Sequence, residues 1–203
     1  IILVMQINNR KIGYKYKPYI IAEMSGNHNQ SLELAFKIVE EAKKSGVDAI
    51  KLQTYTADTI TLNIKKGSFY IKDNKNIWKG RSLYDLYKEA HTPWEWHSKI
   101  FNYAKKLKIT CFSSPFDESA VNFLEKLKVP AYKIASFENI HLPLIEKIAK
   151  TKKPVIISTG MATLAELNES VDLIKKYNHN NLALLKCTSN YPASPKNSNL
   201  RTI

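Results

Sequence analysis

The 203-residue sequence predicts an α/β protein, a parallel (β/α)8 barrel that is truncated after about the sixth strand. Short apolar segments alternate with amphipathic helical segments along almost the whole chain, which is the pattern of repeated β–α units. A glycine-rich turn after the first strand would indicate an open dinucleotide-binding sheet, and the sequence has none. Polar side chains also share one face of several strands, as they do around the mouth of a barrel. The expected strands are 19–24, 49–53, 110–113, 131–135, 155–158 and 182–187.

The helical segments between these strands are expected to begin at capping residues. Thr92 and Glu95 have the spacing of a capping box, in which each side chain bonds the backbone N–H group of the other residue. Thr163 and Glu166 repeat this spacing ahead of the last helical segment. Asn29 or Ser31 is the expected N-cap of the first helix, with Asn29 preferred, because either side chain can accept a hydrogen bond from an early helical N–H group.

The length of the chain limits how much of a barrel it can contain. A complete TIM barrel has eight strands in about 250 residues, so residues 1–203 are expected to form a single, incomplete barrel domain. Residues 5–14, approximately, are expected to form a small hairpin that turns at Asn8 and Asn9. The longest irregular segment, 54–81, follows the second strand, and loops of this length are often functional.

The net charge of +13 is compatible with binding to nucleic acid or to a membrane surface. The lysines are nevertheless dispersed, mostly as pairs near the ends of helical segments, where they complement the helix dipole. The sequence has no run of five basic residues and no nucleic-acid-binding motif. We therefore expect no nucleic-acid partner and no membrane partner. A basic, non-enzymatic anion-binding module is the alternative from another class of function.

The two cysteines and the hydropathy pattern bear on the cellular compartment. Cys111 and Cys187 both lie in apolar, strand-like segments, which is typical of a reduced protein and not of a disulfide scaffold. No apolar stretch reaches the roughly 18–20 residues needed to cross a bilayer. The expected location is the cytoplasm.

Two lysines stand at equivalent places on separate strands. Lys51 shares its strand face with Gln53, and Lys133 alternates with apolar neighbours in the same way. A buried cation requires an anion nearby, and Glu23 and Glu138 are too few to serve both lysines as purely structural partners. A small phosphorylated anion is therefore the expected ligand. Hydroxyl groups suited to such an anion follow neighbouring strands, at Ser136, Ser158 and Thr159.

His28 lies in a polar Asn-His-Asn segment directly after the first strand. From the residue types alone, it is a ligand, a general acid or a hydrogen-bonded loop residue. The sequence has no His-Glu-x-x-His or Cys-x-x-Cys motif, so it contains no self-sufficient metal site.

Several segments resemble, in the same order, the motifs of the sialic acid synthase family, and the similarity extends over residues 16–203. Two further segments, WKGR at 78–81 and YKEAHTPWEWH at 87–97, are most similar to the branch of that family that makes pseudaminic acid. So many linked motifs make the resemblance specific. The family motifs are IIAEMSGNHN at 20–29, KLQTY at 51–55, FSSPFD at 112–117, YKIASFE at 132–138, STGM at 158–161 and CTSNYP at 187–192.

The resemblance implies an enzyme, a transferase that condenses phosphoenolpyruvate with an amino sugar aldehyde and water. For the branch named above, the sugar is 2,4-diacetamido-2,4,6-trideoxy-altrose and the products are pseudaminic acid and phosphate, for surface glycans or flagellin glycosylation. The alternative within the family is synthesis of N-acetylneuraminate or legionaminate, with the same chemistry and a different sugar. Phosphoenolpyruvate carries a carboxylate and a phosphate, so two buried lysines fit its charge.

The resemblance also implies roles for the residues that match the family's motifs. The residues expected to bind phosphoenolpyruvate are Lys51, Lys133, Ser136, Ser158 and Ser189. The residues expected near the sugar and the reacting centre are Glu23, Gln53 and Glu138, as catalytic residues, and Tyr191, as a substrate-binding residue.

Departures from the family pattern modify these expectations. Gln30 replaces the glycine that usually follows the Asn-His-Asn motif, which is expected to change only the energetics of a turn. The family's metal-binding histidines lie on its seventh and eighth strands, so the ligands of the divalent metal, Mn²⁺ or Mg²⁺, are expected beyond Ile203. The family's C-terminal antifreeze-like domain, which closes the neighbouring subunit's site in a homodimer, is expected to be absent from residues 1–203 as well. We therefore expect the 203-residue chain by itself to be inactive.

Overall fold

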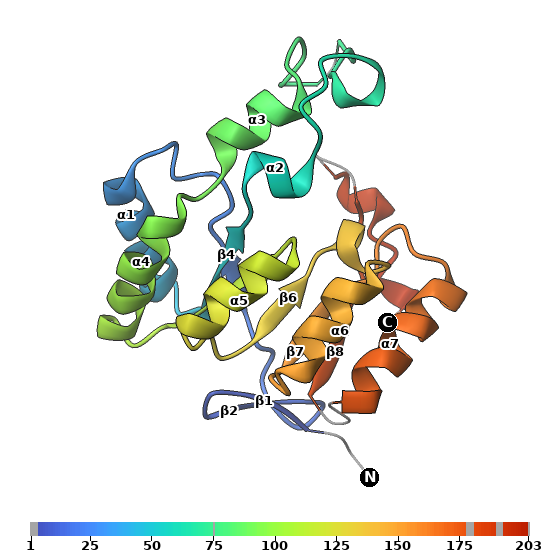
Figure 1. Ribbon diagram of the computed structural model, residues 1–203. Coiled ribbons are helices and arrows are strands. Elements are labelled where there is room, and N and C mark those ends of the chain that lie inside the picture. The colour runs from blue at the N-terminus through green and yellow to red at the C-terminus, as the bar shows by residue number, and fades with distance from the viewer. Residues whose placement is uncertain (1–3, 75, 178–180, 190–192, 203) are drawn as a thin grey trace. The chain divides into compact units, whose positions relative to one another are not determined.

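The structure, a computed structural model, describes residues 4–74, 76–177, 181–189 and 193–202. The chain divides into two compact units, which we call the 20–111 unit and the 112–203 unit, and the second also includes Ile1–Tyr19. The border between them falls within β5 (Thr110–Pro115) (Figure 1).

The 20–111 unit contains a pair of parallel strands and the helices that follow them. β3 (Ile21–Glu23) pairs with β4 (Ala49–Thr54), so that Glu23 lies opposite Lys51. The helices are α1 (Leu32–Lys44), α2 (Ala57–Ile60), α3 (Leu83–Ala90) and α4 (Trp94–Lys106), with a 3-10 turn, η1, at Gly67–Phe69.

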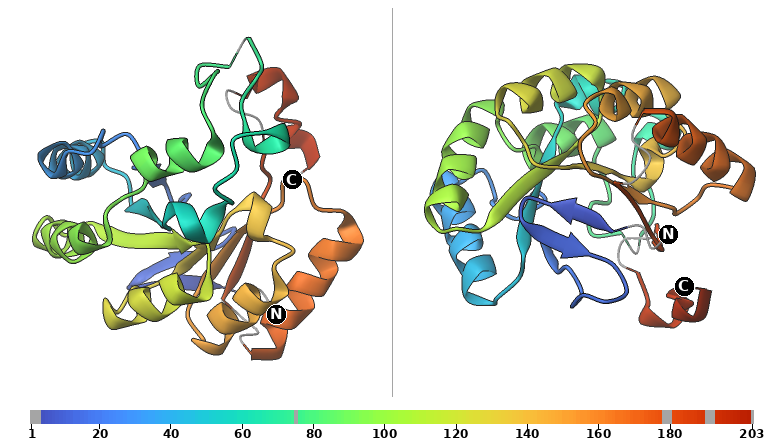
Figure 2. Two further views of the ribbon diagram at one scale, coloured as in Figure 1. Left: turned by 45° about the horizontal axis from the view of Figure 1, so that its top comes forward. Right: turned by 90° about the horizontal axis from the view of Figure 1, so that it is seen from below.

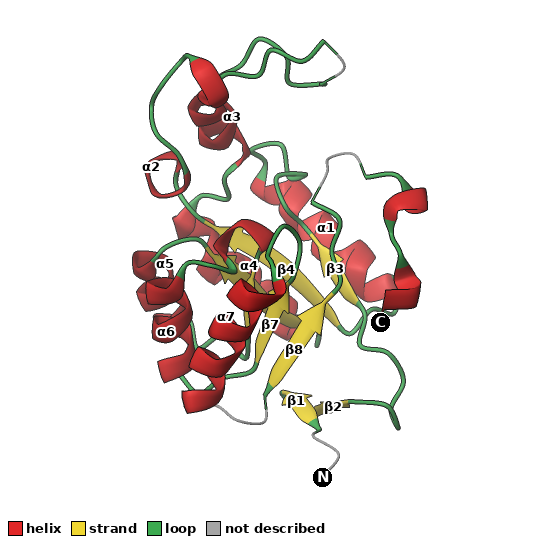
Figure 3. Ribbon diagram, turned by 90° about the vertical axis from the view of Figure 1, so that its right-hand side faces the viewer, coloured by secondary structure: helices red, strands yellow, loops and turns green. Residues whose placement is uncertain are grey.

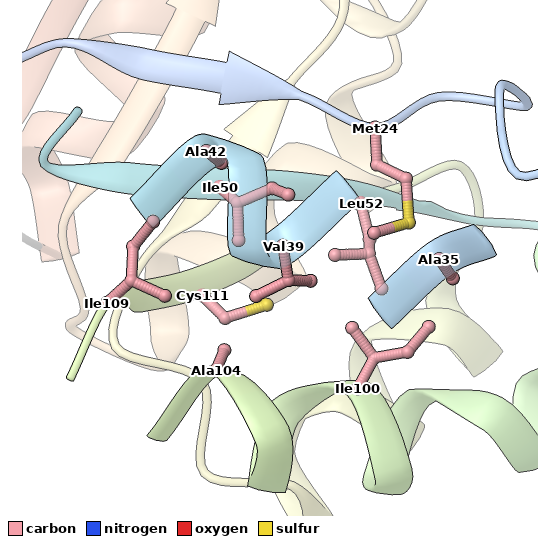
Figure 4. Close-up of a cluster of buried hydrophobic side chains, with 10 residues drawn as sticks. All are labelled: Met24, Ala35, Val39, Ala42, Ile50, Leu52, Ile100, Ala104, Ile109 and Cys111. Carbon is pink, nitrogen blue, oxygen red and sulfur yellow. The ribbon is translucent and has the colours of Figure 1, made fainter. Parts of the chain in front are cut away.

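The core of the 20–111 unit confirms the strand parity expected from the sequence (Figure 4). Ile50 and Leu52 of β4 are fully buried and belong to one apolar cluster with Val39 of α1 and Ile100 of α4. Burial of each such aliphatic side chain contributes about 1.5–3 kcal/mol. Because side chains alternate along a strand, this packing leaves Lys51 on the opposite face of β4.

The segment 54–81 is less irregular than expected, because it contains α2 and η1. Contacts at both of its ends tie it to α3. The Tyr84 hydroxyl donates to a carboxylate oxygen of Asp58 at 2.9 Å, and the guanidinium of Arg81 lies 2.5 Å from the carboxylate of Glu89. Exposed contacts of this kind each contribute little to the free energy of unfolding, so they fix the path of the segment more than they stabilise it.

In the described part of the 112–203 unit, parallel strands pair in the order β5–β6–β7–β8. Figure 2 shows the helices of this unit along one side of these strands. The strands after β5 are β6 (Tyr132–Ile134), β7 (Val155–Ser158) and β8 (Leu182–Leu185). The helices are α5 (Glu118–Lys126), α6 (Leu142–Lys150) and α7 (Leu164–Tyr177), with 3-10 turns η2 (Ser136–Glu138), η3 (Pro195–Asn197) and η4 (Leu200–Thr202).

Strand order distinguishes a barrel from a doubly wound sheet. In a doubly wound sheet the order reverses at a switch point, where ligands bind. Here each described parallel pair within a unit joins strands that are consecutive in the sequence. Within each unit, the described strands, β3–β4 and β5–β8, therefore follow the consecutive strand order of a (β/α)8 barrel.

The expected N-terminal hairpin is confirmed. β1 (Met5–Ile7) and β2 (Arg10–Ile12) pair antiparallel across a turn at Asn8 and Asn9. Asn8 has a φ of 50°, a left-handed conformation that asparagine tolerates better than most residues. Within its unit, the hairpin lies near the amino-terminal ends of β7 and β8 (Figure 3).

Helix caps agree with the sequence in part. The box formed by Thr163 and Glu166 is present ahead of α7. The box expected at Thr92 is wrong, because α4 begins after Pro93 without a side-chain cap and the Thr92 hydroxyl contacts a buried histidine instead. At α1 the preferred cap, Asn29, is also wrong, and the alternative is confirmed, since the side chain of Ser31 accepts the capping hydrogen bond. In both cases the expected start of the helix was correct to within two residues. At α4 the Thr92 hydroxyl bonds His28, and at α1 the Ser31 hydroxyl is the cap.

Candidate active site

The ends of β3 and β4 bring an ammonium and a carboxylate group together in the 20–111 unit. The Lys51 side chain is 5% exposed, and its Nζ lies 2.9 Å from Oε2 of Glu23, whose side chain is 54% exposed. Glu23 thus serves as a partner of Lys51, so the need for an external anion is weaker at Lys51 than the sequence predicted. Gln53 follows Lys51 on the same strand face and is partly buried.

Lys133 of β6 is 5% exposed and donates hydrogen bonds to uncharged groups. Its Nζ lies 2.6 Å from Oγ of Ser158 and 2.8 Å from the carbonyl oxygen of Ile134. Strand register explains the first contact: Lys133 lies opposite Ile156 of β7, and Ser158 follows on the same face two residues later. Both of these acceptors are uncharged oxygen atoms.

Glu138 ends η2, directly after β6. Burial raises the pKa of its carboxyl group to about 7, while its own backbone N–H group and the charge of Lys133 act in the opposite direction. Its Oε2 atom is buried and has no hydrogen-bond partner among the described residues. A carboxyl group that titrates near neutrality populates both protonation states, so Glu138 can act as a general acid or a general base.

Two serine hydroxyls converge on Gly160, which follows β7. A Cβ atom at this position would lie 2.1 Å from Oγ of Ser189 and 2.9 Å from Oγ of Ser136, so glycine alone leaves room for both hydroxyls. Oγ of Ser189 is buried and lacks a hydrogen-bond partner in the part of the chain that the structure describes. A buried hydroxyl of this kind indicates a place for a ligand or a water molecule. The group that we call the lysine–serine cluster consists of Lys133, Ser136, Ser158, Gly160 and Ser189.

The N-terminus of α7 is already occupied by a side chain. Oε2 of Glu166 accepts from the backbone N–H of Thr163 at 2.7 Å and from its hydroxyl at 2.8 Å. This carboxylate takes the place at which a bound anion would meet the helix dipole. The lysine–serine cluster therefore offers a better anion site than the end of this helix.

The sequence did not predict a role for Asn139, which follows η2 and is 2% exposed. Its Nδ2 donates to the carbonyl oxygens of Ser158 and Gly160, each at 3.1 Å. The only signal in the sequence was an asparagine after a strand, and that signal more often marks a turn. The contact depends on how two separate loops approach each other, which spacing along the chain does not encode.

His28 is a buried, hydrogen-bonded loop residue, the third of the roles that the sequence left open. Its Nδ1 accepts from the backbone N–H of Gln30 at 3.2 Å, so its Nε2 carries the proton and donates to Oγ1 of Thr92 at 3.1 Å. Burial and the nearby His91 lower the pKa of His28, which favours this neutral form.

Gln30 does more than change the energetics of a turn, so that expectation is wrong. Its backbone has a φ of 56°, which is strained for a residue with a side chain. Its Nε2 compensates by donating to the carbonyl oxygens of Glu89 and His91, at 2.5 and 2.8 Å. These carbonyls lie at the end of α3, so Gln30 supplies a C-terminal cap for that helix.

We predict that acid destabilises the 20–111 unit through His97. The carbonyl of Pro93 can only accept, so Nδ1 of His97 donates to it at 3.2 Å and Nε2 accepts from the Thr54 hydroxyl at 2.9 Å. Burial lowers the pKa of His97 from 6.5 to about 4. The contribution of neutral His97 to the free energy of unfolding is complete above pH 6.5 and is lost as the pH falls towards 4. The total loss is at most about 3 kcal/mol.

Urea unfolding at a series of pH values from 7 to 5 measures this effect, with His97→Gln as the matched neutral variant. The unsubstituted protein should lose stability more steeply than His97→Gln over this range. Equal slopes would show that His97 does not carry the pH dependence.

Three further expectations concern what the described residues contain. Tyr191 lies outside the described residues, so its position is not part of the site described above. Among the residues that the structure describes, no group of three or more His, Cys, Asp and Glu side chains is arranged to hold a metal ion. In the same ranges, no helix combines the length and the apolar character needed to cross a bilayer.

Residues 38–203 match the NeuB family. The chain belongs to this family. The match spans β4 to β8 and includes every residue of the lysine–serine cluster. The matched region therefore contains Lys133 and the serines of its cluster.

Two relatives are similar to nearly the whole chain. The pseudaminic acid synthase of Helicobacter pylori is 48% identical over 183 residues, which are 90% of this chain and 53% of that protein. The pseudaminic acid synthase of Campylobacter jejuni serotype O:2 is 49% identical over 199 residues, which are 98% of this chain and 57% of that protein. The chain thus spans about half the length of the curated relatives that it matches.

A solved structure confirms the fold. The crystal structure of an N-acetylneuraminic acid (sialic acid) synthetase from Leptospira borgpetersenii in complex with citrate matches 100% of this chain and 65% of that chain. The TM-score is 0.84 at 30% sequence identity. The family assignment and the (β/α)8 barrel class expected from the sequence are therefore both confirmed.

Proposed function

We propose that this chain is part of a pseudaminic acid synthase, a transferase that condenses phosphoenolpyruvate with 2,4-diacetamido-2,4,6-trideoxy-altrose and water to give pseudaminic acid and phosphate. The names and the identity of the Helicobacter and Campylobacter relatives support this choice of sugar. The observation that carries the proposal is the lysine–serine cluster, which joins a buried ammonium group to a buried serine hydroxyl that lacks a partner among the described residues.

The cluster suits an anion with several oxygen atoms. The ammonium group of Lys133 supplies charge, while the hydroxyls of Ser136 and Ser189 supply donors beside the space left by Gly160. Charge-assisted hydrogen bonds of this kind are about twice as strong as neutral ones. We assign the phosphoenolpyruvate anion to these groups, with Ser158 holding the lysine in place.

The reaction also needs proton transfer near the bound anion. C3 of phosphoenolpyruvate attacks the carbonyl carbon of the sugar aldehyde, whose oxygen takes up a proton. Water then adds to C2, the carbon that bears the phosphate, and the new C2 hydroxyl loses its proton as the bond to phosphate breaks. The pKa of Glu138 is raised to about 7, and the nearby charge of Lys133 acts to lower it. We assign Glu138 the role of the acid and base in these steps.

The roles expected for Glu23, Lys51, Gln53 and Tyr191 stay proposals that rest on the resemblance. Glu23 and Lys51 form an ion pair, with Nζ of Lys51 2.9 Å from Oε2 of Glu23. Replacing Lys51 with alanine in the intact protein should weaken phosphoenolpyruvate binding, and unchanged binding would remove it from the site.

Synthases of the NeuB family generally depend on a metal ion. The described residues do not fit such an ion, because no suitable group of donors is present among them. We therefore assign no step of this chain's chemistry to a metal. As the resemblance implies, we propose that Mn²⁺ or Mg²⁺ finds its ligands beyond Ile203.

Other properties of the intact protein are proposed on the same resemblance. We propose that residues 1–203 belong to one barrel domain, that the intact protein is a cytoplasmic homodimer, and that it needs neither nucleic acid nor a membrane. Because the metal site is assigned to residues outside this chain, residues 1–203 alone should release no phosphate from phosphoenolpyruvate.

Phosphate release by the intact protein tests the proposed function. Phosphoenolpyruvate would be supplied with 2,4-diacetamido-2,4,6-trideoxy-altrose, with N-acetylmannosamine or with no sugar. We expect release to depend on the first sugar. A preference for N-acetylmannosamine would overturn the choice of sugar, and no release with any sugar would overturn the reaction.

A further inference from the structure

Two backbone carbonyl groups at the end of β7 accept hydrogen bonds from the same side chain, that of Asn139. The backbone oxygens of Ser158 and Gly160 both accept from Nδ2 of Asn139, each at 3.1 Å. Asn139 is 2% exposed, so these hydrogen bonds are shielded from water. A primary amide has two N–H donors, and the two carbonyls use both of them.

Asn139 is itself held by α7. Oγ of Ser170, a residue that is fully buried, donates to the backbone carbonyl of Asn139 at 2.5 Å. The loop after β6 is therefore connected through Asn139 to the loop after β7 and to the helix that follows it. The connection is made by buried hydrogen bonds, which are costly to leave unmade.

The two carbonyls held by Asn139 belong to residues that shape the lysine–serine cluster. Ser158 receives the hydrogen bond from Lys133, and Gly160 leaves the space into which the hydroxyls of Ser136 and Ser189 project. There is little room between Gly160 and Ser189, because even a methyl group at Gly160 would overlap Oγ of Ser189. A small displacement of residues 158–160 would therefore move Ser158, which accepts from Lys133, and would also bring Gly160 against the serine hydroxyls.

We infer that Asn139 is a positioning residue for phosphoenolpyruvate binding, which sets the geometry of residues 158–160 without touching the ligand, and that Ser170 fixes Asn139. This inference rests on the proposed function, since it assigns the ligand of the lysine–serine cluster. Asn139 acts through backbone carbonyls, so a side chain with the same branching but no hydrogen-bond donor should remove its effect.

The test compares Asn139→Leu and Ser170→Ala with the unsubstituted intact protein. Leucine has the same branched arrangement of side-chain heavy atoms as asparagine but donates no hydrogen bond, and it adds no charge that would affect the binding of an anion. We expect Asn139→Leu to raise KM for phosphoenolpyruvate about 10- to 100-fold and leave KM for the sugar unchanged. Ser170→Ala should raise the same KM about fivefold, because it removes one hydrogen bond at a distance from the cluster.

Two further measurements separate positioning from a general loss of stability. Hydrogen exchange should become faster at residues 158–160 in both variants, and calorimetric titration with phosphoenolpyruvate should show the same loss of affinity as KM. Asn122→Leu is the matched control, because Asn122 is an exposed residue of α5 in the same unit. It should leave both the exchange rates and KM unchanged.

The outcomes distinguish this inference from the proposed function. If the unsubstituted protein binds phosphoenolpyruvate and Asn139→Leu binds it equally well, the positioning role is wrong and the proposed function stands. If Asn139→Leu does not fold, an unchanged KM in Ser170→Ala would overturn the role. If the unsubstituted protein does not bind phosphoenolpyruvate, the proposed function fails and this inference fails with it.

Discussion

Replacing Gly160 with alanine is expected to weaken phosphoenolpyruvate binding by about 100-fold or more, because the new methyl group would displace the two serine hydroxyls of the lysine–serine cluster. The added Cβ would lie 2.1 Å from Oγ of Ser189 and 2.9 Å from Oγ of Ser136, and both distances are shorter than non-bonded atoms tolerate. Gly160 does not have a left-handed backbone conformation, so alanine is not excluded by φ. Calorimetric titration of the intact protein with phosphoenolpyruvate measures the effect.

A second substitution shows whether the loss arises from the cluster or from damage to the fold. Ser189→Ala removes the nearer overlap, so the double variant Gly160→Ala with Ser189→Ala should regain thermal stability while phosphoenolpyruvate binding stays weak. If Gly160→Ala alone binds phosphoenolpyruvate normally, the space beside the serine hydroxyls is not the anion site.

Replacing Lys133 with methionine should weaken phosphoenolpyruvate binding by about 100-fold, equivalent to about 3 kcal/mol, because the cluster loses its charged donor. Methionine keeps the length of the side chain, and an apolar residue in place of a buried charge is usually tolerated by the fold. A second effect follows at Glu138. The charge of Lys133 lowers the pKa of that carboxyl group, so its removal should raise the pKa above its present value of about 7.

Titration of the intact protein with phosphoenolpyruvate from pH 6 to pH 8 measures both effects of Lys133→Met. The matched control is Lys126→Met, which removes the same charge from an exposed position at the end of α5. Loss of affinity in the control as large as in Lys133→Met would mean that overall charge, and not the buried ammonium group, attracts the anion.

The sequence predicted the architecture because alternation along a strand is a local property. Ile50 and Leu52 pack against helices, while Lys51 takes the opposite face, as the period of two requires. Strand ends were less accurate. The last expected strand, 182–187, ends at Leu185, because apolar character alone does not show where pairing with the neighbouring strand stops.

The candidate site was predictable where register could be read from the sequence, and not where two loops meet. Lys133 and Ser158 are brought together by the pairing of β6 with β7, which spacing anticipates. The hydrogen bonds from Asn139 to the carbonyls of Ser158 and Gly160 depend on loop geometry, which spacing along the chain does not encode. Thr92 is a second example of a contact that sequence spacing does not encode. It belongs to a capping motif, but its hydroxyl bonds His28, which is distant in the sequence.

We propose that the lysine–serine cluster binds the phosphoenolpyruvate anion. Hydrogen exchange of the intact protein with and without phosphoenolpyruvate tests it most directly, because exchange reports binding and location together. We predict saturable protection of residues 133–138 and 158–160, which Gly160→Ala abolishes. Protection confined to other segments, or protection that persists in Gly160→Ala, would contradict the account.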